Sequence, residues 1–159
     1  MARNKFNFAE IKERVTKMKN VLPPVLANQA KNYFVGNFSN QSFDGQKWQE
    51  VNRRIPGTSA YKYPKKKDLG RRRRPILIGK GSTKLRRATA NSIRVQKWPI
   101  VRLVVDLPYA RIHNEGLRGR AFGKYGFTMP KRQYIGQTKK LTDMQLKKVK
   151  SYSRKIWHT

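Results

Sequence analysis

Apolar residues near the start of the chain follow a helical period. They recur at three- and four-residue spacing over residues 8–19, with charged residues between them: Phe8, Ile11, Val15 and Met18. The pair Pro23 and Pro24 predicts a stop after this segment. A second helical stripe then covers residues 25–38: Val25, Leu26, Ala30, Tyr33, Phe34 and Phe38. The pattern predicts a long N-terminal helix or a kinked pair of helices.

The middle of the chain changes to short, strand-like patterns. Residues 92–96 alternate and residues 100–107 are rich in β-branched side chains, so the segment around Trp98 and Pro99 is predicted to join two adjacent strands. Residues 127–129 predict another short strand after three loosening glycines, and residues 75–78 fit either a strand or a helix start: Gly119, Gly123, Gly126.

Short helices are also expected between these strands. Ser82 and Thr83 are candidate caps for a helix that runs through Leu85 and Ala88. Residues 109–115 predict one helical turn, which Gly116 is well suited to end. Residues 41–58 are polar and turn-rich, with two aromatic anchors, at Phe43 and Trp48.

A second long helix is predicted at the end of the chain. Thr142 and Gln145 match a capping box, and apolar residues at helical spacing lead to Trp157. Helices at both ends of a strand-rich middle predict an α+β domain with a small, mainly antiparallel sheet. The length of 159 residues favours a single domain over residues 1–159.

Charge changes the picture, because 38 Lys and Arg residues against 8 Asp and Glu give a net charge of +30. Self-repulsion of this size disfavours an isolated compact monomer, so a polyanionic partner or a larger assembly is expected. Residues 98–117 are the most apolar stretch and are locally neutral, because Asp106 and Glu115 balance Arg102 and Arg111. Buried strands and subunit interfaces avoid unpaired charge, so we expect the centre of the fold there.

The densest positive charge falls in an expected exposed loop over about residues 57–75, which Pro64, Gly70 and Pro75 interrupt. Three interpretations stay open: a solvated loop, a contact with nucleic acid or an acidic partner, and a nuclear-localisation signal. The candidate contact residues are Lys65, Lys66, Lys67, Arg71, Arg72, Arg73 and Arg74.

Several classes of protein are disfavoured. The chain has no Cys, which excludes disulfides and thiolate zinc sites. It has no apolar run of about 20 residues that could span a membrane, and no secretory signal is recognisable at Met1. Its 7 Phe, 7 Tyr and 3 Trp residues are too many for a fully disordered chain. We therefore expect a folded, soluble, intracellular protein without a membrane partner.

The sequence offers few parts for catalysis. Its two histidines are His113 and His158, and its eight acids are scattered without a catalytic pair. The segment from Gly79 to Ser82 lacks the spacing of a phosphate-binding loop. We expect no enzyme activity, no cofactor, no metal and no small-molecule substrate. Aromatic residues beside lysines, as at Tyr61 and Tyr63, leave a small basic nucleic-acid-binding protein of ribosomal type as the alternative.

Four blocks in order carry a more specific signal. Residues 109–116 read Tyr-Ala-Arg-Ile-His-Asn-Glu-Gly, and residues 130–136 read Pro-Lys-Arg-Gln-Tyr-Ile-Gly. Together with residues 43–48 and 76–93, they resemble the phage virion morphogenesis family, which includes the tail-completion proteins of Mu-like and P2-like phages and is similar to tail terminators. Asn114-Glu115 stands where that family more usually has Gln-Phe, and Gln133-Tyr134 replaces a Pro-Phe-like pair.

The resemblance implies a tail-terminator-like fold and a structural virion protein without an active site. Such a protein assembles in the host cytoplasm as a ring, commonly sixfold, at the tail–head junction. Its partners would be the tail tube and the head connector or neck proteins, with non-specific contact to packaged DNA. The resemblance places subunit contacts at Tyr109, Ala110, Ile112, His113, Gly116, Pro130, Arg132, Tyr134 and Gly136, with Arg132 facing an acid of a neighbouring copy. Core packing within one subunit is the alternative role for Tyr109, His113 and Tyr134.

Overall fold

The computed structural model describes residues 7–63, 73–78, 83–121 and 123–157. Five α-helices, one 3-10 helix and six short strands make up this part of the chain, in the order α1 (Phe8–Asn40), β1 (Ser42–Phe43), β2 (Gln46–Lys47), η1 (Asn52–Arg54), α2 (Ser59–Lys62), α3 (Lys84–Ala90), β3 (Ile93–Lys97), β4 (Ile100–Leu103), α4 (Ala110–Glu115), β5 (Arg118–Ala121), β6 (Tyr125–Thr128) and α5 (Lys139–Trp157). The predicted α+β class is confirmed, with long helices at both ends.

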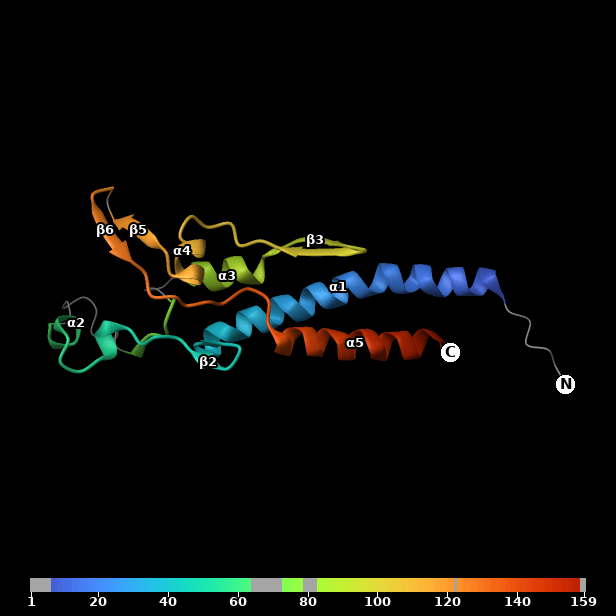
Figure 1. Ribbon diagram of the computed structural model, residues 1–159, viewed down its shortest axis with the longest axis horizontal. Coiled ribbons are helices and arrows are strands. Elements are labelled where there is room, and N and C mark those ends of the chain that lie inside the picture. The colour runs from blue at the N-terminus through green and yellow to red at the C-terminus, as the bar shows by residue number, and fades with distance from the viewer. Residues whose placement is uncertain (1–6, 64–72, 79–82, 122, 158–159) are drawn as a thin grey trace.

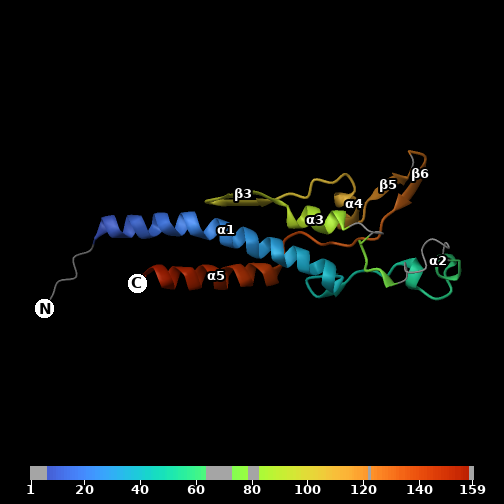
Figure 2. The same ribbon diagram turned by 180° about the vertical axis from the view of Figure 1, so that it is seen from behind.

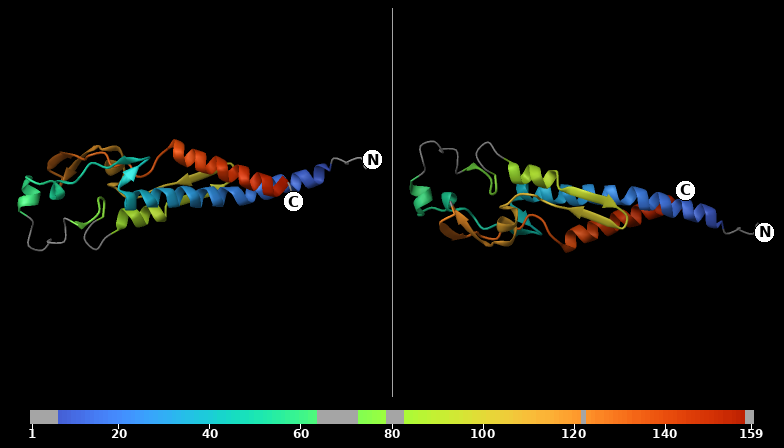
Figure 3. Two further views of the ribbon diagram at one scale, coloured as in Figure 1. Left: turned by 90° about the horizontal axis from the view of Figure 1, so that it is seen from below. Right: turned by 90° about the horizontal axis from the view of Figure 1, so that it is seen from above.

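The molecule is elongated along α1 (Figure 1). Helix α5 and the β3–β4 hairpin both lie alongside α1, and the start of α1 and the end of α5 are at the same end of the molecule (Figures 2 and 3). The opposite end holds α2, α4 and the β5–β6 hairpin. The strands form three separate two-stranded antiparallel sheets where the sequence suggested one small sheet.

Helix α1 settles the alternatives left open for the N-terminal region. It is one helix of 33 residues that runs through Pro23 and Pro24, so the predicted stop at this pair is wrong. The side chain of Asn7 accepts hydrogen bonds from the backbone N–H groups of Ala9 and Glu10, and thereby caps the first turn. Pro23 is buried, and packing of α3, α5, β3 and β4 against α1 outweighs the backbone hydrogen bonds that the prolines remove.

The core lies against the second half of α1, and the expectation that residues 98–117 form its centre is wrong. One cluster of buried residues joins Phe38, Trp48, Ile76, Leu85, Ala110 and Tyr134, and a second joins Ala30, Phe34 and Leu141. From residues 98–117 only Ala110 is buried. Much of this charge-poor stretch is exposed, part of it on the β3–β4 hairpin.

Other predicted elements are partly confirmed. The strands at 93–97 and 100–103 pair as expected, with Ile93 opposite Leu103 and Lys97 opposite Ile100. Helix α4 ends at Gly116, whose φ of 72° is left-handed. Residues 75–78 form neither a strand nor a helix, and the glycine-containing residues 118–121 form β5, which was not predicted.

The predicted cap of α5 is wrong, whereas the N-cap position of α3 at Thr83 is confirmed. Helix α5 begins at Lys139, so Thr142 lies inside it and donates its hydroxyl to the carbonyl of Thr138. Thr138, just before the helix, instead donates its own hydroxyl to Asp44 at 2.7 Å. Thr83 stands at the start of α3 but its side chain makes no capping hydrogen bond, and Ser82 lies outside the described residues. Among the helices that the structure describes, none has the length and apolar character to cross a membrane.

Candidate functional site

The two family-like blocks pack against each other, although 13 residues separate them in sequence. The backbone N–H of Arg132 donates to the carbonyl of His113 at 2.8 Å. The side-chain oxygen of Asn114 accepts from the backbone N–H groups of Tyr134 and Ile135, at 3.0 and 3.2 Å. Helix α4 is therefore fastened to the segment of residues 129–136 through backbone groups, which fixes where the side chains of both blocks point.

Tyr134 is the most deeply buried large side chain of this unit, with 1% of its surface exposed. Its ring packs on Phe38 with centroids 5.2 Å apart, and its hydroxyl donates to the carbonyl of Ala110 at 3.4 Å. Burial, with a smaller contribution from Tyr109, raises the pKa of Tyr134 to about 12. Tyr134 thus packs inside one subunit.

Both glycines of the two blocks adopt a positive φ, and Gly116 also lies close to the backbone of Lys131. A Cβ on Gly116 would lie 2.8 Å from the Cβ of Lys131, and its φ is already left-handed. Gly136 has a φ of 150°, and a Cβ there would meet the amide of Gln133 at 2.5 Å. Pro130 and Ile112 are partly buried beside them. These residues shape the unit and present no reactive group.

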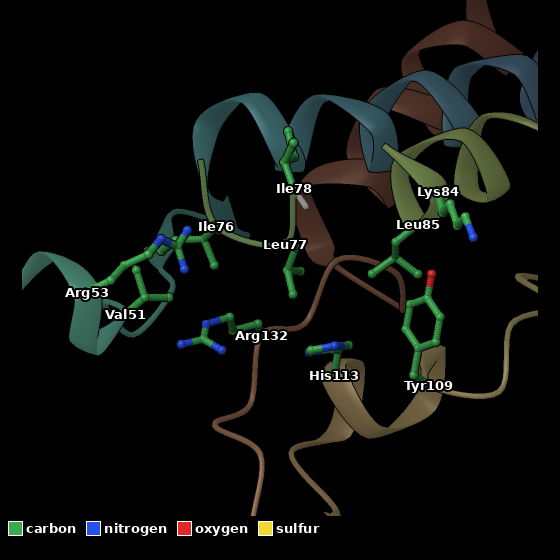
Figure 4. Close-up of a pocket in the computed structure, with 10 residues that line it drawn as sticks. All are labelled: Val51, Arg53, Ile76, Leu77, Ile78, Lys84, Leu85, Tyr109, His113 and Arg132. Carbon is green, nitrogen blue, oxygen red and sulfur yellow. The ribbon is translucent and has the colours of Figure 1, made fainter. Parts of the chain in front are cut away.

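A pocket of about 330 Å³ opens beside this unit. Figure 4 shows its apolar side chains, Leu77 and Leu85, facing a row formed by Arg132, His113 and Tyr109. The remaining lining residues are Val51, Arg53, Ile76, Ile78 and Lys84. Leu77 has a left-handed φ of 62°, a costly conformation for a side chain of this size that is typical of functional sites. The pocket is apolar in the middle and cationic at its edges.

Arg132 supplies a charge in the wall of this pocket that is 6% exposed. Its Nε donates to the carbonyl of Gln49 at 3.2 Å, and one terminal nitrogen lies 3.9 Å from the sulfur of Met129. Burial lowers the pKa of the guanidinium, and the negative charge of Glu50 partly offsets this. An arginine nevertheless stays protonated in proteins, so the positive charge remains.

His113 lies next to this charge. Its ring makes an edge-to-face contact with Tyr109 at 5.9 Å between centroids. Its Nδ1 atom is buried and has no hydrogen-bond partner. Burial, and then the charge of Arg132, lower the pKa of His113 below its ordinary value. The imidazole is therefore neutral at physiological pH.

The expected basic loop falls largely outside the described residues, which include neither Lys65, Lys66 and Lys67 nor Arg71 and Arg72. Arg73 is exposed. The carbonyl of Arg74 accepts from the guanidinium groups of Arg53 and Arg54, which fixes the end of the loop.

The β3–β4 hairpin carries the other notable surface. On the strand side that faces away from α1, Ile100 and Val104 alternate with Arg102 and Asp106, and Trp98 lies at the turn. Trp98, Ile100 and Val104, called here the hairpin patch, are 45%, 51% and 40% exposed. The hairpin patch is apolar, and Arg102 and Asp106 balance each other beside it, but the exposed Lys97 on β3 lies directly opposite Ile100.

Several residues of the site were missed at the level of sequence. Asn114 looked like a departure from the family pattern, yet it accepts two backbone hydrogen bonds. The indole of Trp48, expected only as an apolar anchor, also donates to the carbonyl of Gln133 at 2.6 Å. Arg53 and Lys84 reach the pocket from separate elements, and no local pattern signals that. Within the described part of the chain, no three His, Cys, Asp or Glu side chains gather as metal ligands do.

No protein-family model matches the chain, and comparison with curated proteins and with solved structures gives no match.

Proposed function

We propose that this protein is a structural component of a phage virion, which assembles as a ring, sixfold by the resemblance, at the junction of tail and head. There it completes the tail or neck and supports head–tail joining, in contact with tail-tube and connector proteins. It acts through contacts between protein surfaces and performs no catalysis.

The hairpin patch is the observation that carries this proposal. Exposed apolar surface within a stretch of no net charge, residues 98–117, is unusual in a chain of net charge +30. Two copies of so basic a chain repel each other over most of their surface, so they can approach only where positive charge is low. Residues 98–117, which include the hairpin patch, carry no net charge, although Lys97 on β3 lies opposite Ile100. The hairpin patch also suits burial against a second copy of the chain.

The packing of the two family-like blocks supports the same proposal. Their residues form one rigid unit through Asn114, Arg132 and Tyr134, and this unit makes one end of an elongated subunit. An elongated subunit with a fixed end and the hairpin patch along its side suits repeated side-by-side packing. The positive charge suits a ring through which DNA passes, where it would contact phosphate without reading the sequence.

Molar mass measured by light scattering at several concentrations tests the proposal. The wild-type mass should rise to a fixed multiple of 18.6 kDa, and Ile100→Ser should lower it towards the monomer. Leu146→Ser is the matched control, because Leu146 is 52% exposed on α5, away from the hairpin patch. A wild-type chain that stays monomeric and binds RNA tightly would instead support the ribosomal-type alternative.

A further inference from the structure

Arg132 is a buried charge that no salt bridge compensates, and Glu50 acts on it only from beyond salt-bridge distance. No carboxylate of the described residues lies within salt-bridge distance of it, and its two contacts are to a carbonyl and a thioether. Taking an unpaired guanidinium out of water is costly unless opposite charge compensates it. Among the described residues, the positive charge in the wall of the pocket therefore has no negative group close enough to compensate it.

Three further observations indicate that a negative group would bind in the pocket. His113 lines the same pocket as Arg132, and its buried Nδ1 has no hydrogen-bond partner. Arg53 and Lys84 add two more cations to the lining, to which no acidic residue of the described ranges contributes. Leu77 holds the opposite wall in a left-handed conformation.

We propose that this pocket is an oxyanion-binding site, which takes a carboxylate or phosphate group carried on a slender, partly apolar body. The guanidinium of Arg132 offers its remaining N–H groups to the oxyanion, a charge-assisted geometry that favours two parallel hydrogen bonds. The imidazole of His113 supplies a further hydrogen bond from Nδ1. Leu77 and Leu85 contact the apolar body of the ligand.

The depth and volume of the pocket limit the size of the ligand. Arg132 is 6% exposed and the cavity holds about 330 Å³, so a free small anion or a single side chain can enter it. The phosphates of a DNA duplex are fixed on a wide, stiff rod and cannot reach the guanidinium. The site is thus separate from any non-specific DNA contact, and it does not depend on the proposed ring.

Calorimetric titration of the full chain with succinate and with inorganic phosphate tests the site. Saturable binding of at least one probe is expected, and Arg132→Met should weaken it by about tenfold or more. Methionine fills the space of the arginine stem, and removal of a buried unpaired charge in this way is tolerated by folded proteins. Lys150→Met, on exposed α5 surface, is the matched control and should bind as the wild type does.

A second variant tests the same site in case Arg132→Met does not fold. Lys84→Met changes the lining of the pocket at its edge and should weaken binding while the circular-dichroism spectrum stays unchanged. Absence of saturable binding to both probes, or equal binding by wild type and both pocket variants, overturns the proposal.

A second measurement distinguishes the two possible sources of the natural oxyanion, a second copy of the chain and a free small molecule. Molar mass is compared in saturating probe and in sodium chloride of equal ionic strength. A fall in mass with the probe assigns the oxyanion to an acidic side chain of a second copy, because the probe then competes with it. An unchanged mass assigns it to a free small molecule.

Discussion

His113 shows how one buried atom ties stability to pH. Its ring is packed between Tyr109 and Arg132, and the charged lining groups beside it, Arg53, Lys84 and Arg132, are all positive. A proton on the imidazole would add a further positive charge to the same buried space. The folded protein therefore resists protonation of His113 more strongly than the unfolded chain does.

Lowering the pH should therefore destabilise the folded protein. The unfolded chain takes up the proton near pH 6.5, and the folded protein takes it up only at lower pH because the pKa of His113 is lowered. The free energy of unfolding should therefore fall as the pH drops from about 7.5 to about 5.5. In urea titrations across this range His113→Gln should show a flatter dependence, with His158 unchanged in both proteins. Equal slopes would contradict this account.

The contacts of Asn114 and Arg132 could not be predicted from the sequence. The importance of Arg132 was predicted from the motif, but its burial against Gln49 joins segments 83 residues apart in sequence. The role of Asn114 depends on two N–H groups that lie 20 and 21 residues away. A side chain that serves the backbone of another segment leaves no local pattern, so only the folded arrangement shows it.

Among the elements, α1 carries the largest conflict between local preference and packing. Pro23 and Pro24 cannot donate the backbone hydrogen bonds of a helix interior, and each ring crowds the preceding turn. The periodicity of the apolar residues predicted the helical segments on both sides. It could not predict their fusion, because that depends on α5, which contacts α1 on both sides of the prolines, at Arg14 and at Phe34.

Replacement of one proline measures this conflict. Pro24 is less buried than Pro23, so Pro24→Ala should restore a hydrogen bond without emptying the core and should raise the free energy of unfolding by about 2 kcal/mol. Urea unfolding followed by circular dichroism gives the value. Pro108→Ala, in the exposed connection before α4, should give no comparable gain. A loss of stability in Pro24→Ala would show that its ring contributes to packing.

The shorter elements also differ in whether the local sequence or the packing of other segments determines them. The β3–β4 pair and the end of α4 at Gly116 follow from alternation and turn chemistry, and both were predicted. Strand β5 contains Gly119, whose missing side chain leaves room for the ring of Phe127 on β6; an added Cβ would lie 2.6 Å from it. Glycine weakens a strand signal in sequence, and the cross-strand ring that compensates for it is visible only in the paired hairpin.

At the scale of the whole molecule, the net charge of +30 dominates. The ion pairs Glu10–Arg14, Glu50–Arg54 and Glu115–Arg111 each join residues four apart in the chain. Such exposed local pairs contribute little and do not hold separate elements together. The elongated shape lowers the repulsion by spreading the charge, although α5 still brings its lysines alongside α1.

Salt should therefore stabilise the protein. The thermal midpoint is expected to rise between about 20 mM and about 500 mM sodium chloride, because the Debye length falls well below the spacing of charges on neighbouring elements. Scanning calorimetry measures the midpoint. A Lys147→Glu/Lys150→Glu variant of the exposed face of α5 should show a smaller rise. A midpoint that is independent of salt in the wild type would contradict the dominance of repulsion.

The pairing of α1 with α5 also has a consequence for synthesis on the ribosome. Ala30 and Phe34 emerge early, but Leu141, which covers them, is made more than a hundred residues later. At the usual rate of translation this delay is roughly 5 to 20 seconds. During that time the nascent chain presents an uncovered apolar stripe, so the interval before α5 emerges is when aggregation competes most strongly with folding.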